Sequence, residues 1–198
     1  LDDAVPLSEA LLRGGISALE ITLRTSEGYA AISAMKSAFP DAVIGAGTVC
    51  SSDEYRRSVD AGADFVVSPG ASEQLFAAAA SHKVSFVPGA ATGSEVIFAL
   101  ERGYSTLKFF PAETSGGEPT IRALSGPFPQ VRFMPTGGIT LDNMGRYLNL
   151  SSVCAVGGSW LTPADLLAAQ KWDDLSELAR HTVPVSYTHL TLPTSSQV

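Results

Sequence analysis

The residue with the clearest chemical potential in this sequence is Lys108, which stands in the middle of the apolar run Thr106 to Pro111. Lysine is almost never buried without a partner or a purpose. Burial in an apolar strand disfavours the ammonium form, so some neutral amine becomes available to attack a carbonyl carbon. Two structural alternatives stay open: Lys108 forms an ion pair with Glu20, or its head group reaches solvent at the strand end. Taken alone, the segment supports a Schiff-base lysine and these structural roles equally.

A second group of chemically useful side chains lies in the segment Leu19 to Arg24, where apolar and polar residues alternate. In a strand this alternation places Glu20, Thr22 and Arg24 on the same face. The carboxylate can act as a general acid or base, and the neighbouring guanidinium can bind an anion. The structural alternative is a core ion pair that holds the layers of the interior together.

Glycine pairs end two later β-rich runs, in Thr136-Gly137-Gly138 and in Gly157-Gly158-Ser159. Glycine lets the backbone approach a phosphate closely, and Ser159 adds a hydroxyl donor. A single glycine pair usually marks only a tight turn. Two pairs at the ends of two consecutive strands favour a phosphate site. Another strand end, Gly45-Ala46-Gly47-Thr48, offers a hydroxyl for a carboxylate, although Thr48 is equally suited to a turn or cap.

The elements that must position these residues form a βα repeat, in which β-rich runs ending in small residues alternate with Ala/Leu-rich amphipathic stretches. The predicted strands are Ala18 to Leu23, Ala42 to Thr48, Asp64 to Pro69, Val84 to Gly89, Thr106 to Pro111, Val131 to Gly137 and Ser152 to Gly158. The predicted helices are Val5 to Arg13, Gly28 to Ala38, Asp53 to Ala61, Ser72 to Ala80, Ser94 to Arg102, Leu141 to Leu148 and Leu175 to His181, with Ser52 and Ser72 as capping candidates. Crossovers of similar length indicate parallel strands, and their regular spacing favours a closed barrel over an open doubly wound sheet.

The expected fold class is therefore α/β, a (β/α)8 TIM barrel that lacks its first strand in this chain, because the sequence opens with a helix. Counted with that strand, the two glycine pairs follow strands seven and eight, where such barrels commonly bind phosphate. We expect a barrel domain over residues 1–184. Residues 185–198 do not continue the pattern and are predicted to be a non-native or disordered tail.

The bulk composition indicates one soluble enzyme domain. The chain has 198 residues, 45% of them hydrophobic, and its net charge of -7 disfavours a nucleic-acid partner. No apolar run is long enough to span a membrane and no signal peptide is visible, so a cytoplasmic location is expected. Cys50 and Cys154 are predicted to be free thiols. His82, His181 and His189 lie away from the strand ends, and neither a catalytic histidine nor a metal is expected.

Taken together, the motifs resemble the KDPG/KHG aldolase family, whose substrates are 2-keto-3-deoxy-6-phosphogluconate and 4-hydroxy-2-oxoglutarate. The segments that carry the resemblance are Leu19 to Thr25, Gly45 to Val49, Ser68 to Gly70, Val87 to Gly89, Lys108 to Glu113, Pro135 to Ile139 and Gly157 to Trp160. The likeness covers about Leu1 to Val183. It departs from the family at the ends, where the additional first strand is missing and the tail has no counterpart.

The resemblance implies a role for each candidate residue. Lys108 is the Schiff-base lysine and Glu20 the general acid/base. The implied substrate-binding residues are Arg24 and Thr48 for the pyruvate carboxylate, Gly137, Gly138 and Ser159 for the phosphate, and Pro88, Phe110 and Thr136 along the pocket.

The implied function is a class I aldolase that cleaves 2-dehydro-3-deoxy-6-phosphogluconate to pyruvate and glyceraldehyde 3-phosphate without a cofactor or metal. The resemblance also implies a homotrimer in the lower Entner-Doudoroff pathway. Alternatives are the same chemistry on 4-hydroxy-2-oxoglutarate or the galacto epimer, a non-aldolase barrel that binds sugar phosphates with Lys108 as a charge, and an inactive fragment.

Overall fold

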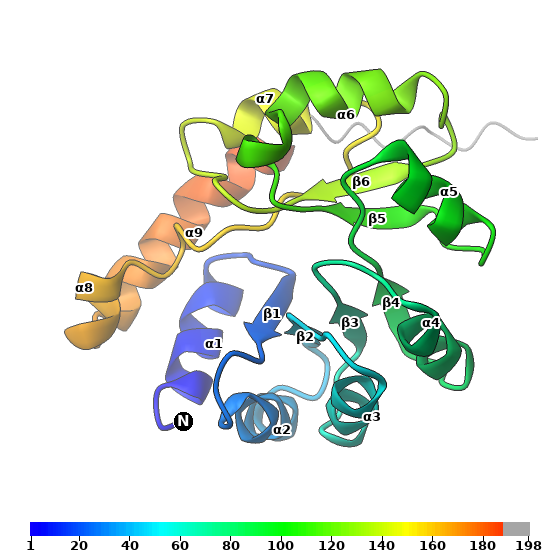
Figure 1. Ribbon diagram of the computed structural model, residues 1–198. Coiled ribbons are helices and arrows are strands. Elements are labelled where there is room, and N and C mark those ends of the chain that lie inside the picture. The colour runs from blue at the N-terminus through cyan, green and yellow to red at the C-terminus, as the bar shows by residue number, and fades with distance from the viewer. Residues whose placement is uncertain (188–198) are drawn as a thin grey trace, which may run out of the picture.

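The computed structural model describes residues 1–187, in which helices and parallel strands alternate along the chain. The strands are β1 (Ala18–Thr22), β2 (Val43–Gly47), β3 (Phe65–Val67), β4 (Ser85–Val87), β5 (Thr106–Phe109) and β6 (Arg132–Pro135). The helices are α1 (Ala4–Arg13), α2 (Gly28–Ala38), α3 (Ser52–Asp60), α4 (Glu73–Ala80), α5 (Gly93–Leu100), α6 (Gly117–Ser125), α7 (Met144–Leu148), α8 (Ala164–Ala168) and α9 (Trp172–Tyr187), with a 3-10 turn at Glu113–Ser115. Figure 1 shows the strands around an interior and the helices on the outside.

All strand pairs are parallel, and together they form most of a closed wall. Strands β1 to β4 make one sheet in sequence order, and β5 pairs with β6. A bridge between Gly89 and Lys108 joins the two sheets. Beyond β6, the segment that contains Val153 and Gly157 joins the wall through two bridges, from Phe133 to Val153 and from Thr136 to Gly157.

This wall confirms the predicted (β/α) barrel. Strand β1 lies at the edge of its sheet, and within residues 1–187 no strand precedes α1. The predicted strand Ser152 to Gly158 is present only as bridges at Val153 and Gly157. The parallel direction of every pair brings the carboxyl ends of the strands to one end of the barrel, where the predicted site residues lie.

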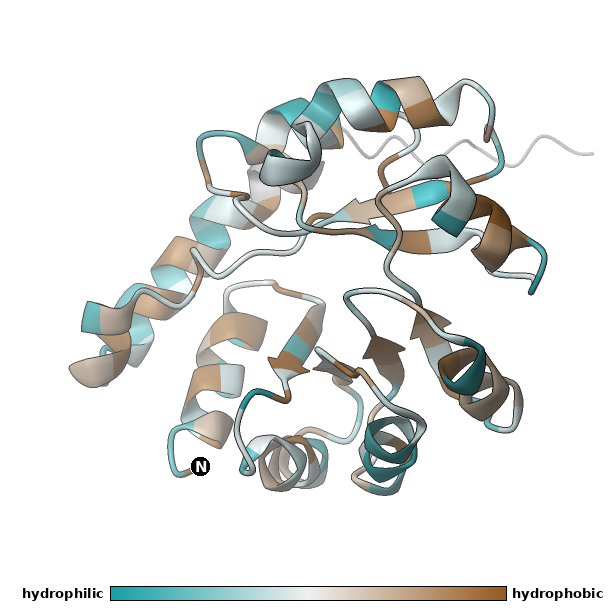
Figure 2. Cartoon of the chain, viewed as in Figure 1, coloured by the Kyte–Doolittle hydropathy of each residue, from teal (hydrophilic) through white to brown (hydrophobic). Residues whose placement is uncertain are grey.

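Alternation along the strands separates the barrel interior from the layer beneath the helices. Leu19, Ile44, Val66, Leu107 and Phe133 are buried in the hydrophobic core. The residues between them in the strands face the other way, into the barrel. Figure 2 shows strands β3 and β4 coloured hydrophobic, whereas much of the outer helix α3 is hydrophilic.

Helix starts follow from local capping. The Ser72 hydroxyl accepts a hydrogen bond from the Leu75 amide and caps α4, as predicted. The predicted cap Ser52 is wrong by one residue, since Ser51 caps α3. Ser51 has Glu54 three residues later, and the two residues form a reciprocal capping box that Ser52 cannot form with Tyr55.

Two helices were not expected from the sequence. Helix α6 begins at Gly117, directly after Gly116, and contains Pro119 in its first turn; both glycines have left-handed φ values. This local sequence is typical of a loop, but proline is tolerated in the first turn of a helix. The short helix α8 was also missed. Helix α7 begins at Met144 rather than Leu141, and before it the Thr140 and Asn143 side chains each accept a hydrogen bond from the other residue's amide.

The C-terminal helix differs from its prediction. Helix α9 runs over Trp172–Tyr187, whereas the predicted helix covers Leu175 to His181. Three residues of the predicted tail 185–198 therefore continue this helix, and the others lie outside the described residues. None of the helices within residues 1–187 combines the length and apolarity needed to cross a membrane.

Candidate active site

Lys108 and Glu20 meet inside the barrel although they come from β5 and β1. The Nζ of Lys108 donates a hydrogen bond of 3.4 Å to Oε1 of Glu20. Lys108 is only 5% exposed, as its apolar strand predicts. Backbone bonds to neighbouring residues hold it in place, since its amide donates to the Pro88 carbonyl at 2.9 Å and its carbonyl accepts from the Ala90 amide at 2.8 Å. The amine and the carboxylate are thus adjacent. A molecule bound to the Lys108 amine would therefore lie close enough to Glu20 for proton transfer.

Room for the Glu20 side chain is provided by Gly47 on the neighbouring strand β2. A Cβ atom at Gly47 would lie 2.6 Å from Cδ and 2.7 Å from Cγ of Glu20. Real Cβ contacts are essentially never this short. The carboxylate can therefore occupy its place beside Lys108 only because residue 47 has no side chain.

Aromatic and apolar groups surround the amine. Nζ of Lys108 lies 5.3 Å from the centroid of the Phe110 ring. The same ring lies against the next strand end, where a Cβ at Gly137 would be 3.2 Å from two of its carbons. In the register of β5 and β6, Met134 stands opposite Lys108. Phe110 therefore lies between the amine and the glycine pair predicted to bind phosphate.

Thr48 and Arg24 lie at the ends of β2 and β1. Thr48 has a left-handed φ of 63°, a conformation that costs a non-glycine residue free energy and tends to cluster at functional sites. Arg24 is exposed, lies two residues beyond the end of β1, and has no ion pair within residues 1–187. The alternative of a core ion pair between Glu20 and Arg24 is wrong, because the carboxylate turns inward to Lys108 while the guanidinium lies in the following turn.

The turn Gly137-Gly138 has the backbone features of an anion site. Both residues have left-handed φ values, 100° and 80°. Their carbonyls are occupied: that of Gly137 accepts from the Glu113 amide at 3.1 Å, and that of Gly138 from the Asn143 side-chain amide at 2.8 Å. Neither glycine amide makes a hydrogen bond within residues 1–187. Donors without a partner at such a turn are available to an anion.

The remaining predicted residues lie around this turn. The hydroxyl of Thr136 is buried and has no hydrogen-bond partner within the described part of the chain. Thr136 bridges to Gly157, two residues before the exposed Ser159. The two glycine pairs are therefore brought side by side from separate strand ends, as their spacing predicts.

Sequence reasoning missed one residue of this region, Tyr147. The hydroxyl of Tyr147 donates to Oε1 of Glu113, and a Cβ at Gly138 would lie 2.7 Å from Cγ of Glu113. Glu113 belongs to a motif segment but received no role. No local signal marks Tyr147, because its partner is 34 residues away.

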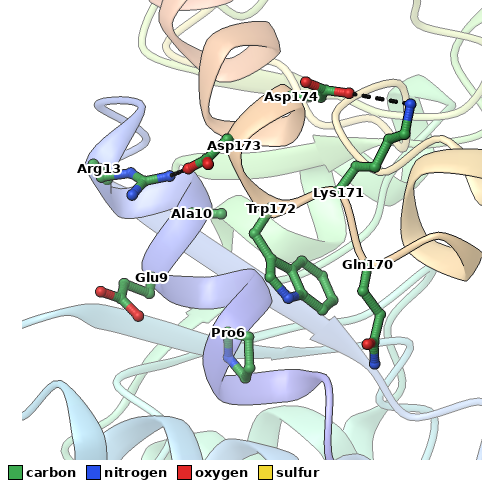
Figure 3. A pocket seen from close by; sticks show the side chains of 9 residues that line it. All are labelled: Pro6, Glu9, Ala10, Arg13, Gln170, Lys171, Trp172, Asp173 and Asp174. Atoms are coloured by element: carbon green, nitrogen blue, oxygen red, sulfur yellow. Dashed lines mark hydrogen bonds and ion pairs between the residues drawn. The ribbon is translucent and has the colours of Figure 1, made fainter.

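A cavity of about 500 Å³ lies outside the barrel wall, between α1 and the start of α9. Figure 3 shows Trp172 pointing into it between Pro6 and Gln170. Two ion pairs border it, Arg13 with Asp173 at 2.5 Å and Lys171 with Asp174 at 3.6 Å. The cavity contains none of the predicted site residues, and these ion pairs neutralise much of the charge on its wall.

A parallel (β/α) barrel with a buried lysine beside a carboxylate belongs to the class of (β/α)-barrel enzymes. The family model "KDPG and KHG aldolase" matches residues 1–178. The chain is 45% identical over 183 residues to the KHG/KDPG aldolase of Escherichia coli strain K12, covering 92% of this chain and 86% of that protein. The chain therefore belongs to the KDPG and KHG aldolase family.

Solved structures agree with this assignment. A KDPG aldolase from Legionella pneumophila, with pyruvate captured as a covalent carbinolamine intermediate, superposes with a TM-score of 0.89 at 44% identity, covering 91% of this chain and 88% of that one. The 2-keto-3-deoxy-6-phosphogluconate aldolase of Zymomonas mobilis ZM4 with 3-phosphoglycerate has a TM-score of 0.85 at 41% identity, covering 91% and 85%.

Proposed function

We propose that this protein is a class I aldolase that cleaves 2-dehydro-3-deoxy-6-phosphogluconate into pyruvate and glyceraldehyde 3-phosphate through a Schiff base on Lys108. The observation that carries the proposal is the buried Lys108 amine, 3.4 Å from the Glu20 carboxylate inside the barrel. The covalent pyruvate intermediate named for the Legionella relative supports the same chemistry.

The reaction begins when the neutral Lys108 amine adds to the C2 ketone and water leaves, forming an iminium ion. Glu20, directly or through a water, takes the proton of the C4 hydroxyl. The electron pair of the C3–C4 bond moves into the iminium, which becomes an enamine, and glyceraldehyde 3-phosphate departs as the aldehyde. Glu20 then returns a proton to C3, and hydrolysis releases pyruvate and the free amine.

Binding groups are proposed at both ends of the substrate. Arg24 and Thr48 hold the pyruvate carboxylate, a role that suits the exposed guanidinium and the strained backbone of Thr48. The unoccupied amides of Gly137 and Gly138, with the hydroxyl of Ser159, bind the phosphate. Pro88, Phe110 and Thr136 line the path between these ends.

Cleavage of 4-hydroxy-2-oxoglutarate is a second candidate activity. The name KHG/KDPG aldolase of the Escherichia coli relative supports it. The chemical steps at Lys108 and Glu20 are common to both substrates, since both are 2-keto acids with a hydroxyl at C4. The two substrates differ beyond C4, where only the sugar acid carries a phosphate.

Assembly and location are part of the proposal. Family resemblance supports a cytoplasmic homotrimer acting in the lower Entner-Doudoroff pathway. Analytical ultracentrifugation of the purified chain tests the assembly, and a monomer at micromolar concentration would remove the trimer from the proposal.

Reduction with borohydride in the presence of pyruvate, followed by peptide mapping, tests the Schiff base. We expect a reduced pyruvyl adduct on Lys108 and none in the Lys108→Arg variant. The chain offers internal controls in Lys36, Lys83 and Lys171. Labelling of these lysines in place of Lys108, or no labelling of a folded sample, would refute the proposal.

A further inference from the structure

The Gly137-Gly138 turn is supported from behind by Glu113. The backbone amide of Glu113 donates to the Gly137 carbonyl at 3.1 Å. Its side chain occupies the space where a side chain of residue 138 would be, because a Cβ at Gly138 would lie 2.7 Å from Cγ and 2.8 Å from Cβ of Glu113. One residue therefore fixes the turn through both its backbone and its side chain.

Glu113 is itself an exposed residue, and one contact to a buried group anchors it. Its Oε1 accepts a hydrogen bond from the hydroxyl of Tyr147 in α7, and Tyr147 is fully buried. Burial, followed by the hydrogen bond to Glu113, raises the pKa of Tyr147. The phenol consequently keeps its proton and remains a donor at neutral pH.

We propose that Tyr147 is a positioning residue for the phosphate end of the substrate, which it serves by holding the Glu113 side chain behind Gly138. The inference rests on the proposed function, because it concerns the phosphate subsite of the same reaction. Without the Tyr147 hydroxyl, the Glu113 side chain is free to leave the turn. The two glycine amides then lose their fixed direction, and a mobile carboxylate is released beside an anion site.

The effect must be confined to substrates that carry a phosphate. Glu20 and Lys108 come from β1 and β5, and within residues 1–187 the Tyr147 hydroxyl makes its hydrogen bond to Glu113 and none to either of them. Loss of the Tyr147 hydroxyl should therefore raise the KM of the phosphorylated substrate and leave the bond-breaking step unchanged. A residue with a merely structural role would reduce activity on all substrates together.

Tyr147→Phe is the test, with Tyr55→Phe as a matched control. Tyr55 is also fully buried, and its hydroxyl donates a hydrogen bond of 3.0 Å to the Val84 carbonyl on the other side of the barrel. Both variants lose one buried hydrogen bond and should lose similar melting temperature. We expect Tyr147→Phe to raise the KM for 2-dehydro-3-deoxy-6-phosphogluconate about five- to tenfold, as one lost hydrogen bond allows, with kcat within about twofold.

The second substrate and a simple anion sharpen the test. With 4-hydroxy-2-oxoglutarate, neither variant should change KM. Inorganic phosphate can be used as an inhibitor of 4-hydroxy-2-oxoglutarate cleavage. It should bind Tyr147→Phe more weakly, by the same factor as the rise in KM for the phosphorylated substrate. Identical kinetics of Tyr147→Phe and Tyr55→Phe, or an equal loss on both substrates, would overturn the inference.

Glu113 variants give the same answer without altering a buried residue. Glu113→Ala removes the support and should raise the KM at least as much as Tyr147→Phe. Glu113→Gln keeps an oxygen that can accept from Tyr147 and should restore the wild-type KM. An unchanged KM in Glu113→Ala overturns the inference even if Tyr147→Phe does not fold. If the wild-type protein cleaves neither substrate, the proposed function is refuted, and the inference with it. If the wild type is active, the KM values of the variants decide whether Tyr147 positions the phosphate end.

Discussion

Replacing Gly47 by alanine should displace Glu20, the proposed proton-transfer group, without altering Lys108. Gly47 borders Glu20, and an added Cβ would lie 2.6 Å from Cδ of that residue. Ordinary van der Waals contact begins at 3.4 Å, so the carboxylate must retreat by about 0.8 Å or more. Its hydrogen bond to Lys108 is already 3.4 Å long, so a further separation of the two groups would break it.

The magnitude follows from the role of the displaced group. A positioned general acid or base contributes about 10²- to 10⁴-fold to a rate, and a misplacement of about 1 Å can cost 10²-fold. We therefore expect Gly47→Ala to lower kcat by about 10²-fold on both substrates. Borohydride trapping of pyruvate on Lys108 should persist, because the amine remains buried in β5.

Steady-state kinetics and trapping would be measured together, with Gly145→Ala as the control. Gly145 lies in α7, where an added Cβ meets nothing within 4 Å, and alanine is favoured over glycine in a helix. The control should retain full activity. A kcat of Gly47→Ala within about threefold of wild type would refute the reasoning, since it would mean either that Glu20 need not occupy its observed place or that the strand adjusts at no cost.

Two further outcomes are expected. Ser159→Ala should remove one hydrogen bond to a charged group, worth about 1.5 to 3 kcal/mol, and lower kcat/KM for the phosphorylated substrate roughly 10- to 150-fold. Cleavage of 4-hydroxy-2-oxoglutarate should barely change, and an equal loss on both would mean that Ser159 shapes the barrel mouth in general. Burial of Glu95 favours a higher pKa, but hydrogen bonds from the Ala91 amide and from the hydroxyl and amide of Thr92 lower the pKa of this carboxyl overall. The ionised Glu95 carboxylate thus stabilises the fold above its unfolded-state pKa of about 4.3, and this stabilisation is lost as pH falls through the lower folded-state pKa. Glu95→Gln should therefore reduce the melting temperature at pH 7 and much less at pH 3. Equal reductions at both pH values would contradict this.

The strands could be predicted because each one carries its own signal. An apolar run ending in small residues identified all six strands of the structure, with ends displaced by two residues or fewer, and α2 was predicted with its observed bounds. Helix α6 could not be found in this way, because Gly116 precedes it and it begins with Gly117 and contains Pro119. Tertiary packing of Ile121, which is fully buried, supports a helix that local propensity does not favour.

The site could be predicted in part. The apolar strand around Lys108 left a Schiff-base lysine and a structural lysine equally open, and the family resemblance favoured the first. The contact with Glu20 appeared only as a structural alternative. Alternation favoured Arg24 as the neighbour of Glu20, but the strand ends at Thr22 and the partner comes from β5. Gly47 belongs to a small-residue strand end that the sequence shows, but its contact with Glu20 on the neighbouring strand does not follow from that pattern. Tyr147 acts through Glu113 on another element, so no pattern within its own segment reveals it.

The contact between Lys108 and Glu20 spans 88 residues of sequence and joins two separately paired sheets. Contacts of such long range form only after the intervening loops have closed, which is entropically costly and slow. A chain that has formed its helices but has not yet joined β1 to β5 therefore carries a solvated lysine and a distant carboxylate. If Lys108 and Glu20 have the roles proposed above, a partly assembled molecule of this kind lacks its reaction centre.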